Sequence, residues 1–169
     1  MTRQDILIRA VEPDDYEAMQ DIHAQPKVIW GTMRIPFHSL EYWRKRLADF
    51  PASGHSLVAE IDGRVVGAAG LMVDSHNPRR RHVGEVGMAV HDDFQGQGIG
   101  RKLLEACLEL ADQWLNLRRV ELEVYTDNDV AILLYQSCGF EIEGTLRDDV
   151  FRDGEFVDAH VMARLNTRT

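Results

Sequence analysis

The stretch FQGQGIGRKLLE at residues 94–105 constrains the fold of this chain more than any other. Ordering a glycine costs more backbone entropy than ordering any other residue, so three glycines at alternate positions need a structural reason. The residues before them, 82–90 (HVGEVGMAV), are typical of a strand. The residues after them, from about 99 to 116, repeat apolar side chains at three- and four-residue intervals and predict a helix. At this strand-to-helix turn, either the chain only turns or a ligand approaches the backbone closely.

The remaining segments predict further strands and helices. The clearest hairpin joins strands 55–61 and 64–73 around the Asp62-Gly63 turn. Segment 25–37 (QPKVIWGTMRIPF) contains two prolines and a glycine and is expected to be irregular, although it is apolar for a loop. Other expected strands are 5–11, 118–125, 140–151 and 155–165, and other expected helices open at Pro13 and cover 40–49, after the Ser39 cap, and 129–138. This order predicts an α/β (α+β) fold, with a mixed, mostly antiparallel sheet of about seven strands flanked by about four helices.

Composition limits the class of partner. The 169 residues carry a formal net charge of -9, so the chain lacks the positive charge that dominates nucleic-acid affinity, and no nucleic-acid or membrane partner is expected. No apolar run approaches the roughly 20 residues of a membrane helix, and the N-terminus is not typical of a signal peptide. Cys107 and Cys138 are expected to be buried thiols in a reducing cytoplasm. We expect one cytoplasmic domain over residues 1–169.

Three mechanisms could use the glycine-rich turn. A phosphate-binding P-loop requires Ser or Thr after its lysine, but Leu103 follows Lys102. The dinucleotide fingerprint requires a third glycine where Arg101 stands. A helix N-terminus that attracts an anion through its free N–H groups fits the sequence better. From this turn alone, a plain turn before an amphipathic helix fits equally well.

Two segments, in order and on the expected elements, resemble the GCN5-related N-acetyltransferase (GNAT) superfamily. Gln95-x-x-Gly98-x-Gly100 matches its [RQ]xxGx[GA] signature. About 30 residues later, N-x-x-A-x-x-x-Y-x-x-x-G-F at residues 128–140 resembles its second cofactor-binding segment. Within the superfamily, PRRRHVGEVG (78–87), GFEIEGT (139–145) and FRDGEFVDAHVMARL (151–165) resemble the YhhY-type L-amino-acid N-acetyltransferases. The resemblance implies the GNAT fold, with acetyl-CoA as the cosubstrate, no metal, and a small-molecule amine, such as an L-amino acid, as the acceptor.

The resemblance also implies a donor site. The backbone of Met88, Ala89 and Val90 would pair with the pantetheine arm, and an N–H near Met88 would polarise the thioester carbonyl. The pyrophosphate would be held by residues 95–101, namely Gln95, Gly96, Gln97, Gly98, Ile99, Gly100 and Arg101. Asn128 would either reach the cofactor or cap its own helix. Asp92 departs from the family pattern, because many members have proline there.

Two residues are candidates for proton transfer. Tyr135 is the candidate acid for the departing thiolate, and its alternative is a core aromatic. Glu85 is the candidate base, working through water, because a carboxylate on a central strand is costly to bury without a partner or a task. The alternative for Glu85 is a salt bridge. His82 is a weaker candidate base.

The acceptor pocket is expected between the first two helices. Trp30 and Phe37 would supply aromatic walls, and Arg34 would bind a substrate carboxylate. Arg79, Arg80 and Arg81 form either a solvated turn or a second anion site. Alternative functions are acetylation of a protein N-terminus or lysine, and a CoA-binding regulatory module without catalysis. Family members are often dimers, so a homodimer is possible.

Overall fold

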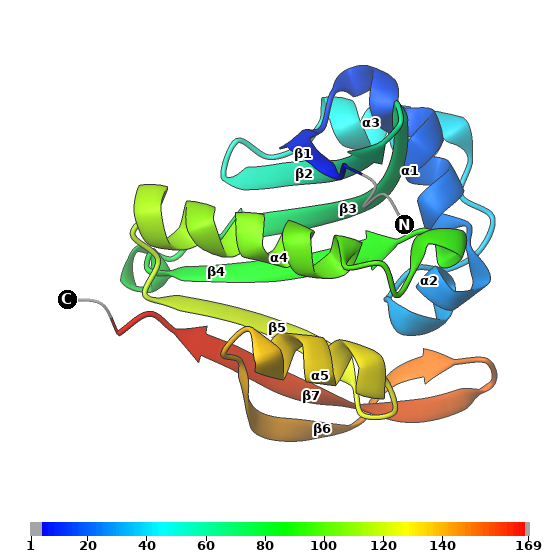
Figure 1. The fold of residues 1–169 in the computed structure, drawn as a ribbon. Coiled ribbons are helices and arrows are strands. Elements are labelled where there is room, and N and C mark those ends of the chain that lie inside the picture. The colour runs from blue at the N-terminus through cyan, green and yellow to red at the C-terminus, as the bar shows by residue number, and fades with distance from the viewer. Residues whose placement is uncertain (1–4, 168–169) are drawn as a thin grey trace.

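The computed structural model describes residues 5–167, and the four N-terminal and two C-terminal residues included in the single-domain prediction lie outside this range. The described chain forms a seven-stranded sheet in the order β1-β2-β3-β4-β5-β7-β6 (Figure 1). The strands are β1 (Leu7–Ala10), β2 (Gly54–Ile61), β3 (Arg64–Val73), β4 (Val83–Val90), β5 (Arg119–Tyr125), β6 (Glu141–Arg152) and β7 (Glu155–Leu165). The helices are α1 (Tyr16–His23), α2 (Pro26–Gly31), α3 (Leu40–Ala48), α4 (Ile99–Glu109) and α5 (Asp129–Ser137). The mixed α/β fold predicted from the sequence is confirmed.

The sheet is antiparallel except at its centre. There β4 and β5 run parallel, because helix α4 carries the chain back across the sheet between them. Their pairing covers only residues 83–85 and 119–121, and it ends at the pair Glu85–Glu121. Both strands continue beyond this pair, β4 to Val90 and β5 to Tyr125. The two central strands therefore diverge along the second half of β4.

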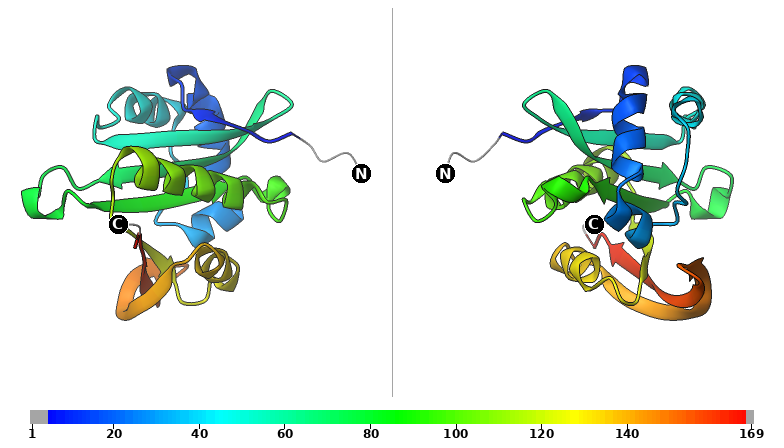
Figure 2. Two further views of the ribbon diagram at one scale, coloured as in Figure 1. Left: turned by 60° about the vertical axis from the view of Figure 1, so that its left-hand side comes forward. Right: turned by 90° about the vertical axis from the view of Figure 1, so that its right-hand side faces the viewer.

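Helices cover both faces of the sheet (Figure 2). One buried cluster joins the sheet to α4 and α5 through side chains such as Leu103, Leu104 and Tyr135. The other joins it to α1 and α3 through Met19, Ile22 and Trp43, while Val28 anchors α2 in the same cluster. Neighbouring strand residues alternate between the two clusters, as the two-residue period of a strand requires. The site described below lies where these two layers meet at the β4–β5 divergence.

Two helical segments differ from their sequence-based prediction. The segment expected to be irregular contains α2, whose six residues are too few to show helical periodicity. Pro26 stands at its first turn, where a missing N–H costs nothing. The predicted helix 99–116 is α-helical only to Glu109 and continues as a π-helical turn over 110–114. A π turn shifts the helical phase, and Trp114, which belongs to the apolar repeat of residues 99–116, is 76% exposed.

Within residues 5–167, every helix is too short or too polar to span a bilayer.

Gly84 on β4 is expected to be intolerant of any side chain. A Cβ there would lie 2.7 Å from Leu117 Cδ1 and 3.0 Å from Leu71 Cδ1, and both leucines are buried. We expect Gly84→Ala to lower the free energy of unfolding by about 1–3 kcal/mol, because the packed core must shift. Gly87→Ala is the matched control, since a Cβ at Gly87 would meet nothing within 4 Å. Urea denaturation of both variants checks this, and equal midpoints would contradict the packing described here.

Candidate functional site

The glycine-rich turn leads from β4 to α4 and leaves its backbone open. Gly96 and Gly98 have φ values of 76° and 83°, a left-handed conformation that favours glycine. Gly98 is the N-cap of α4 and has no side chain to bond to the first helical N–H groups. A Cβ at either glycine would meet nothing within 4 Å, so a ligand can approach the turn closely. These features fit an anion such as a pyrophosphate at the positive end of α4.

Other residues of the turn hold it in shape. Gln95 donates from Nε2 to the Val90 carbonyl at 3.0 Å, and Gln97 donates to the Asp93 carbonyl at 3.3 Å. Asp92, where many family members have proline, accepts the Lys27 N–H at 3.0 Å and so ties the turn to α2. Both glutamines therefore brace the loop through their own amides.

The first turn of α4 packs against α5. Ile99 is 1% exposed, so only its backbone is available to a ligand. A Cβ on Gly100 would lie 3.4 Å from Leu134 Cδ2, so Gly100 allows the two helices to approach closely. Arg101 donates to Ser137 Oγ at 2.7 Å and therefore reaches α5 rather than the turn. Asn128 caps α5 by accepting the Ala131 N–H at 3.3 Å, as the capping alternative predicts.

The divergence of β4 from β5 leaves one edge of β4 without a strand partner. Met88, Ala89 and Val90 stay paired with β3, on which their partners are Ala69, Ala68 and Gly67. On the β5 side, no residue of β4 after Glu85 is paired. An extended ligand arm can therefore hydrogen-bond to this edge as an added strand would.

A cavity of about 550 Å³ opens beside this edge. Its wall carries two carboxylates, Glu85 and Glu123, and two guanidinium groups, Arg34 and Arg46. Its floor includes Gly70 and Gly87, which are direct partners in the β3–β4 ladder. A Cβ on either glycine would meet nothing within 4 Å, so the missing side chains keep the floor open.

The two carboxylates form the acidic pole of the cavity. Glu85 is exposed, so the burial expected from its place on a central strand is wrong. Among the described residues neither carboxylate makes an ion pair, whereas Glu121 pairs with Arg80 and Arg119, each at 2.6 Å. Glu123 is exposed as well, but desolvation by the cavity wall raises the pKa of its carboxyl, and the charges of Asp149, Glu85 and Glu121 raise it further. The salt bridge considered for Glu85 is therefore not formed within the described chain.

Arg34 and Arg46 form the basic pole. Arg34 is partly buried with its guanidinium carbon 5.3 Å from the Trp43 ring, and it donates to the Tyr42 hydroxyl at 3.4 Å. Burial lowers the pKa of Arg34, but a guanidinium stays charged in proteins. No carboxylate of the described chain pairs with it, so its charge is available to a ligand anion. The neighbouring His23 is neutral at pH 7, because burial lowers its pKa to about 4.

Tyr135 reaches the cavity from α5, on the other side of the sheet. It is 8% exposed, and its ring centroid lies 5.7 Å from that of Phe140. Burial raises its pKa to about 12, so the phenol stays protonated at neutral pH. Its hydroxyl makes no hydrogen bond to any residue in the described range, which leaves the proton free to be donated. The cavity therefore presents two carboxylates and a phenol from opposite faces of the sheet.

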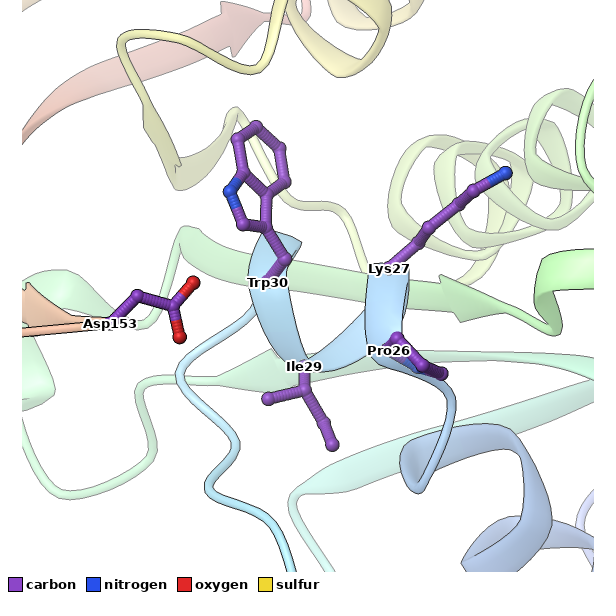
Figure 3. A pocket seen from close by; sticks show the side chains of 5 residues that line it. All are labelled: Pro26, Lys27, Ile29, Trp30 and Asp153. Carbon is purple, nitrogen blue, oxygen red and sulfur yellow. The ribbon is translucent and has the colours of Figure 1, made fainter.

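The structure does not bring Trp30 and Phe37 into this cavity. Trp30 lines a separate hollow of about 530 Å³, where its side chain points away from Ile29 and Asp153 lies beside it (Figure 3). The guanidinium carbon of Arg152 lies 4.2 Å from the Trp30 ring centroid, so Trp30 anchors α2 to the β6–β7 hairpin. Phe37 is 99% exposed. Of the three residues expected to bind the acceptor, only Arg34 lines the cavity with Glu85.

Sequence reasoning missed three residues of the site: Glu123, Arg46 and Gly70. Of the two glycines that flank Glu85 in the sequence, Gly87 leaves open space as expected, whereas Gly84 is closely packed.

The alternation of residues 120–124 places Glu121 and Glu123 on one face of β5. Only the observed contacts show that Glu121 forms an ion pair with Arg119, whereas Glu123 faces the cavity.

The arginine run 79–81 lies in the turn before β4. There Arg80 forms an ion pair with Asp74 at 3.1 Å, so it belongs to the turn. Within residues 5–167, no cluster of His, Cys, Asp and Glu is arranged to hold a metal ion.

Known proteins resemble this chain along most of its length. The profile of the acetyltransferase (GNAT) family matches residues 16–140. The L-amino acid N-acetyltransferase AaaT of Escherichia coli (strain K12) is 44% identical over 161 residues, covering 95% of this chain and 98% of that protein. A spermidine N(1)-acetyltransferase of Vibrio cholerae is 25% identical over 96% of this chain and 94% of its own length. The solved structure of a GNAT-family acetyltransferase from Streptococcus pneumoniae has a TM-score of 0.82 at 27% identity, covering 95% of this chain and 99% of that one.

Proposed function

The chain belongs to the acetyltransferase (GNAT) family and is an acetyl-CoA-dependent N-acetyltransferase; we propose that its acceptor is the α-amino group of an L-amino acid. The observation that carries the proposal is that one cavity holds two groups of opposite charge: Glu85 and Glu123, whose charges interact, and Arg34 and Arg46, which both lie over the Trp43 ring. A zwitterionic amino acid has matching charges, an ammonium for the carboxylates and a carboxylate for the guanidinium groups. The 44% identical relative is named as an L-amino acid N-acetyltransferase, which supports the same acceptor.

The donor side follows from the open turn and the free edge of β4. We assign the pyrophosphate to the turn 95–101, where backbone N–H groups and the α4 dipole attract its charge. Gln95 and Gln97 shape this turn, and Ile99 contributes through its backbone. The pantetheine arm would pair with the backbone of residues 88–90, with an N–H near Met88 facing the acetyl carbonyl oxygen. When bound, acetyl-CoA supplies the acetyl group as a thioester.

The acceptor side positions the amine between its two poles. Arg34 would hold the carboxylate of the amino acid, and the acidic pole that contains Glu85 would receive the ammonium and then its proton. Tyr135 would give its proton to the departing sulfur, because its raised pKa keeps the phenol protonated. The buried ring of Tyr135 is fixed by packing, so the hydroxyl is held at the gap between β4 and β5.

The charges of the cavity weigh against the alternative acceptors. A relative at 25% identity is named as acting on spermidine, a polycation, but Arg34 and Arg46 would repel a second positive charge. A protein N-terminus or lysine needs an open groove, whereas residues 31–34 wall one side of this cavity. A regulatory module without catalysis has no use for a free phenol and two unpaired carboxylates in one cavity.

We also propose that two copies associate through the β6–β7 hairpin. β6 is an edge strand, and the hairpin exposes Ile142, Leu146, Phe151 and Phe156. Edge strands and exposed apolar patches are common places for a second chain to bind. We expect sedimentation equilibrium to give a dimer for the unaltered chain and a monomer for the double variant Phe151→Ser, Phe156→Ser; a monomer for both would contradict this assignment. A cytoplasmic location is proposed because Cys107 and Cys138 are free thiols. Cys107 is buried as expected, whereas Cys138 is only half-buried, because it lies just after the end of α5.

Replacing Arg34 tests the carboxylate site. A hydrogen bond to a charged group contributes about 1.5–3 kcal/mol, so Arg34→Gln should raise KM for the preferred amino acid by about 10- to 150-fold. The KM for the same compound lacking its carboxylate should not rise, because it makes no contact with Arg34. Steady-state kinetics with both acceptors measure this, after a panel of amino acids has identified the preferred one.

Arg44→Gln is the control for Arg34, because Arg44 lies on the exposed side of α3. It should leave both KM values unchanged. Equal losses with both acceptors in Arg34→Gln would place the carboxylate elsewhere. If no amino acid accelerates CoA release by the unaltered enzyme, the proposed acceptor class itself is wrong.

Replacing Tyr135 tests the proton donor. General acid catalysis contributes about 10²- to 10⁴-fold, so Tyr135→Phe should lower kcat by that range while leaving CoA binding unchanged. The pKa of about 12 has a further consequence: Tyr135 stays protonated up to pH 10, so its ionisation should not reduce the rate there. Tyr16→Phe, a change outside the cavity, is the control. An unaltered kcat in Tyr135→Phe at every pH would remove the residue from the mechanism.

A further inference from the structure

We propose that Arg152 is a positioning residue for the acceptor, and that it fixes the place of Arg34 by holding the C-terminal end of α2. The inference rests on the proposed function and deepens it, because it names the contacts that orient the carboxylate-binding group. Arg152 is the last residue of β6, and its side chain is only 13% exposed. It is not among the described residues that line the acceptor cavity, so it acts on the acceptor through another group.

A tight turn fixes the backbone of Arg152. Arg152 pairs with Glu155 across the β6–β7 ladder, and only Asp153 and Gly154 lie between the two. The φ values of these two residues are 51° and 86°, as in the centre of a type I′ turn. Such a turn matches the twist of its two strands, so the side chain of Arg152 starts from a defined point of the hairpin.

The guanidinium group of Arg152 joins the end of α2 to the end of β5. It donates to both carboxylate oxygens of Asp127, which lies between β5 and α5. It also donates to the Trp30 carbonyl at 3.4 Å. Its central carbon lies 4.2 Å from the Trp30 ring centroid and 5.0 Å from that of Tyr125. A planar guanidinium can form a bidentate ion pair and lie over aromatic rings at the same time, whereas an ammonium cannot.

Tyr125 adds a second link to the same end of α2. It is the last residue of β5 and is 4% exposed. Its hydroxyl donates to the carbonyl of Thr32, the residue that follows α2, at 2.9 Å. Burial raises the pKa of Tyr125, so the hydroxyl keeps the proton of this hydrogen bond. Arg152 and Tyr125 together form what we call the α2 clamp.

Hydrogen bonds continue from Thr32 to Arg34. The Thr32 hydroxyl donates to the Val28 carbonyl at 2.7 Å and accepts the Arg34 N–H at 3.3 Å. The backbone of Arg34 is therefore fixed relative to the end of α2. From there the Arg34 side chain lies over the Trp43 ring and lines the cavity. The α2 clamp thus determines where this guanidinium group meets an acceptor carboxylate.

The neighbouring segments give Arg34 little other support. Ile35 and Phe37, which follow it, are 66% and 99% exposed. A helix of six residues such as α2 is not stable on its own, so its position depends on contacts with the rest of the chain. The buried Val28 holds the first part of α2, and the α2 clamp holds its end. Loss of the clamp should therefore displace Arg34 without unfolding the protein.

The test measures whether Arg152 and Arg34 act on the KM for the preferred amino acid independently. Residues in one network of contacts are coupled by about 2- to 150-fold, and we expect Arg152→Gln to raise this KM by about 5- to 50-fold. In an Arg34→Gln background the same change should raise it less than about twofold, because Arg152 acts through Arg34. The KM for acetyl-CoA, and that for the same acceptor without its carboxylate, should change by less than about twofold.

Two further variants accompany the test. Tyr125→Phe removes only the hydroxyl of the α2 clamp and keeps the buried ring, so it keeps the test decisive if Arg152→Gln is unstable. Loss of one neutral hydrogen bond should raise the KM for the amino acid by about 2- to 10-fold. Arg147→Gln is the matched control, because Arg147 is an exposed arginine of the same strand. It should leave every KM unchanged.

The indole N–H resonances of the tryptophans report the same displacement without relying on activity. The chain has three tryptophans, of which Trp30 contacts Arg152 and Trp43 contacts Arg34. The third, Trp114, is 76% exposed. In ¹H–¹⁵N spectra, Arg152→Gln should shift the resonances of Trp30 and Trp43 and leave that of Trp114 in place. Arg147→Gln should shift none of them.

The inference is overturned if Arg152→Gln raises the KM for the amino acid by the same factor with and without Arg34. It is also overturned if only the Trp30 resonance moves, because Arg152 would then not reach Arg34. An equal rise in KM for the acceptor without a carboxylate would contradict it as well. Each of these results leaves the proposed function standing, because that fails only if the unaltered enzyme acetylates no amino acid. In that case the indole resonances still test the α2 clamp.

Discussion

The site depends on the loss of pairing between β4 and β5 after Glu85 and Glu121. A sheet normally satisfies its backbone groups with neighbouring strands, and an unpaired edge within a sheet needs another partner. Here the edge of β4 faces a cavity, the N-terminus of α4 lies just beyond its end, and Tyr135 reaches the gap from α5. The early end of the β4–β5 pairing thus leaves an unpaired backbone edge on β4, to which a ligand can hydrogen-bond. It also opens a gap in the sheet through which residues of both faces line one cavity.

The elements around the gap keep it open in different ways. On one face, Gly100 lets α4 approach α5 closely, and Arg101 bonds to Ser137. On the other face, Trp43 anchors α3 beside Arg34, and Arg152 holds α2 against the β6–β7 hairpin. In the proposed mechanism the donor site is built from backbone and the acceptor site from charged side chains. This division fits a family whose relatives are named for different acceptors, an L-amino acid in one and spermidine in another.

The fold and the glycine-rich turn could be predicted from the sequence because their signals are local. Alternating strands, the Asp62-Gly63 hairpin and the spaced glycines each occupy a few consecutive residues. The acceptor site depends on contacts distant in sequence, such as Arg34 near Trp43 and Glu123 near Glu85. Apolar character suggested Trp30 and Phe37 as its walls, but Trp30 is held by Arg152 and Phe37 faces solvent. A charge on a central strand is expected to be buried, yet Glu85 is exposed to the cavity. The neighbouring Glu123 is recognised only from the pairing of the strands and the lining of the cavity.

We propose that donor and acceptor meet in the gap between β4 and β5, and a crystal structure of the enzyme with CoA and an N-acetyl amino acid would test this. We expect the pantetheine arm to pair with residues 88–90 and the product carboxylate to contact Arg34. The amide nitrogen of the product should lie between the acidic pole of the cavity and the CoA sulfur. A product bound outside this cavity, or a β5 that closes onto β4 and displaces the arm, would contradict it.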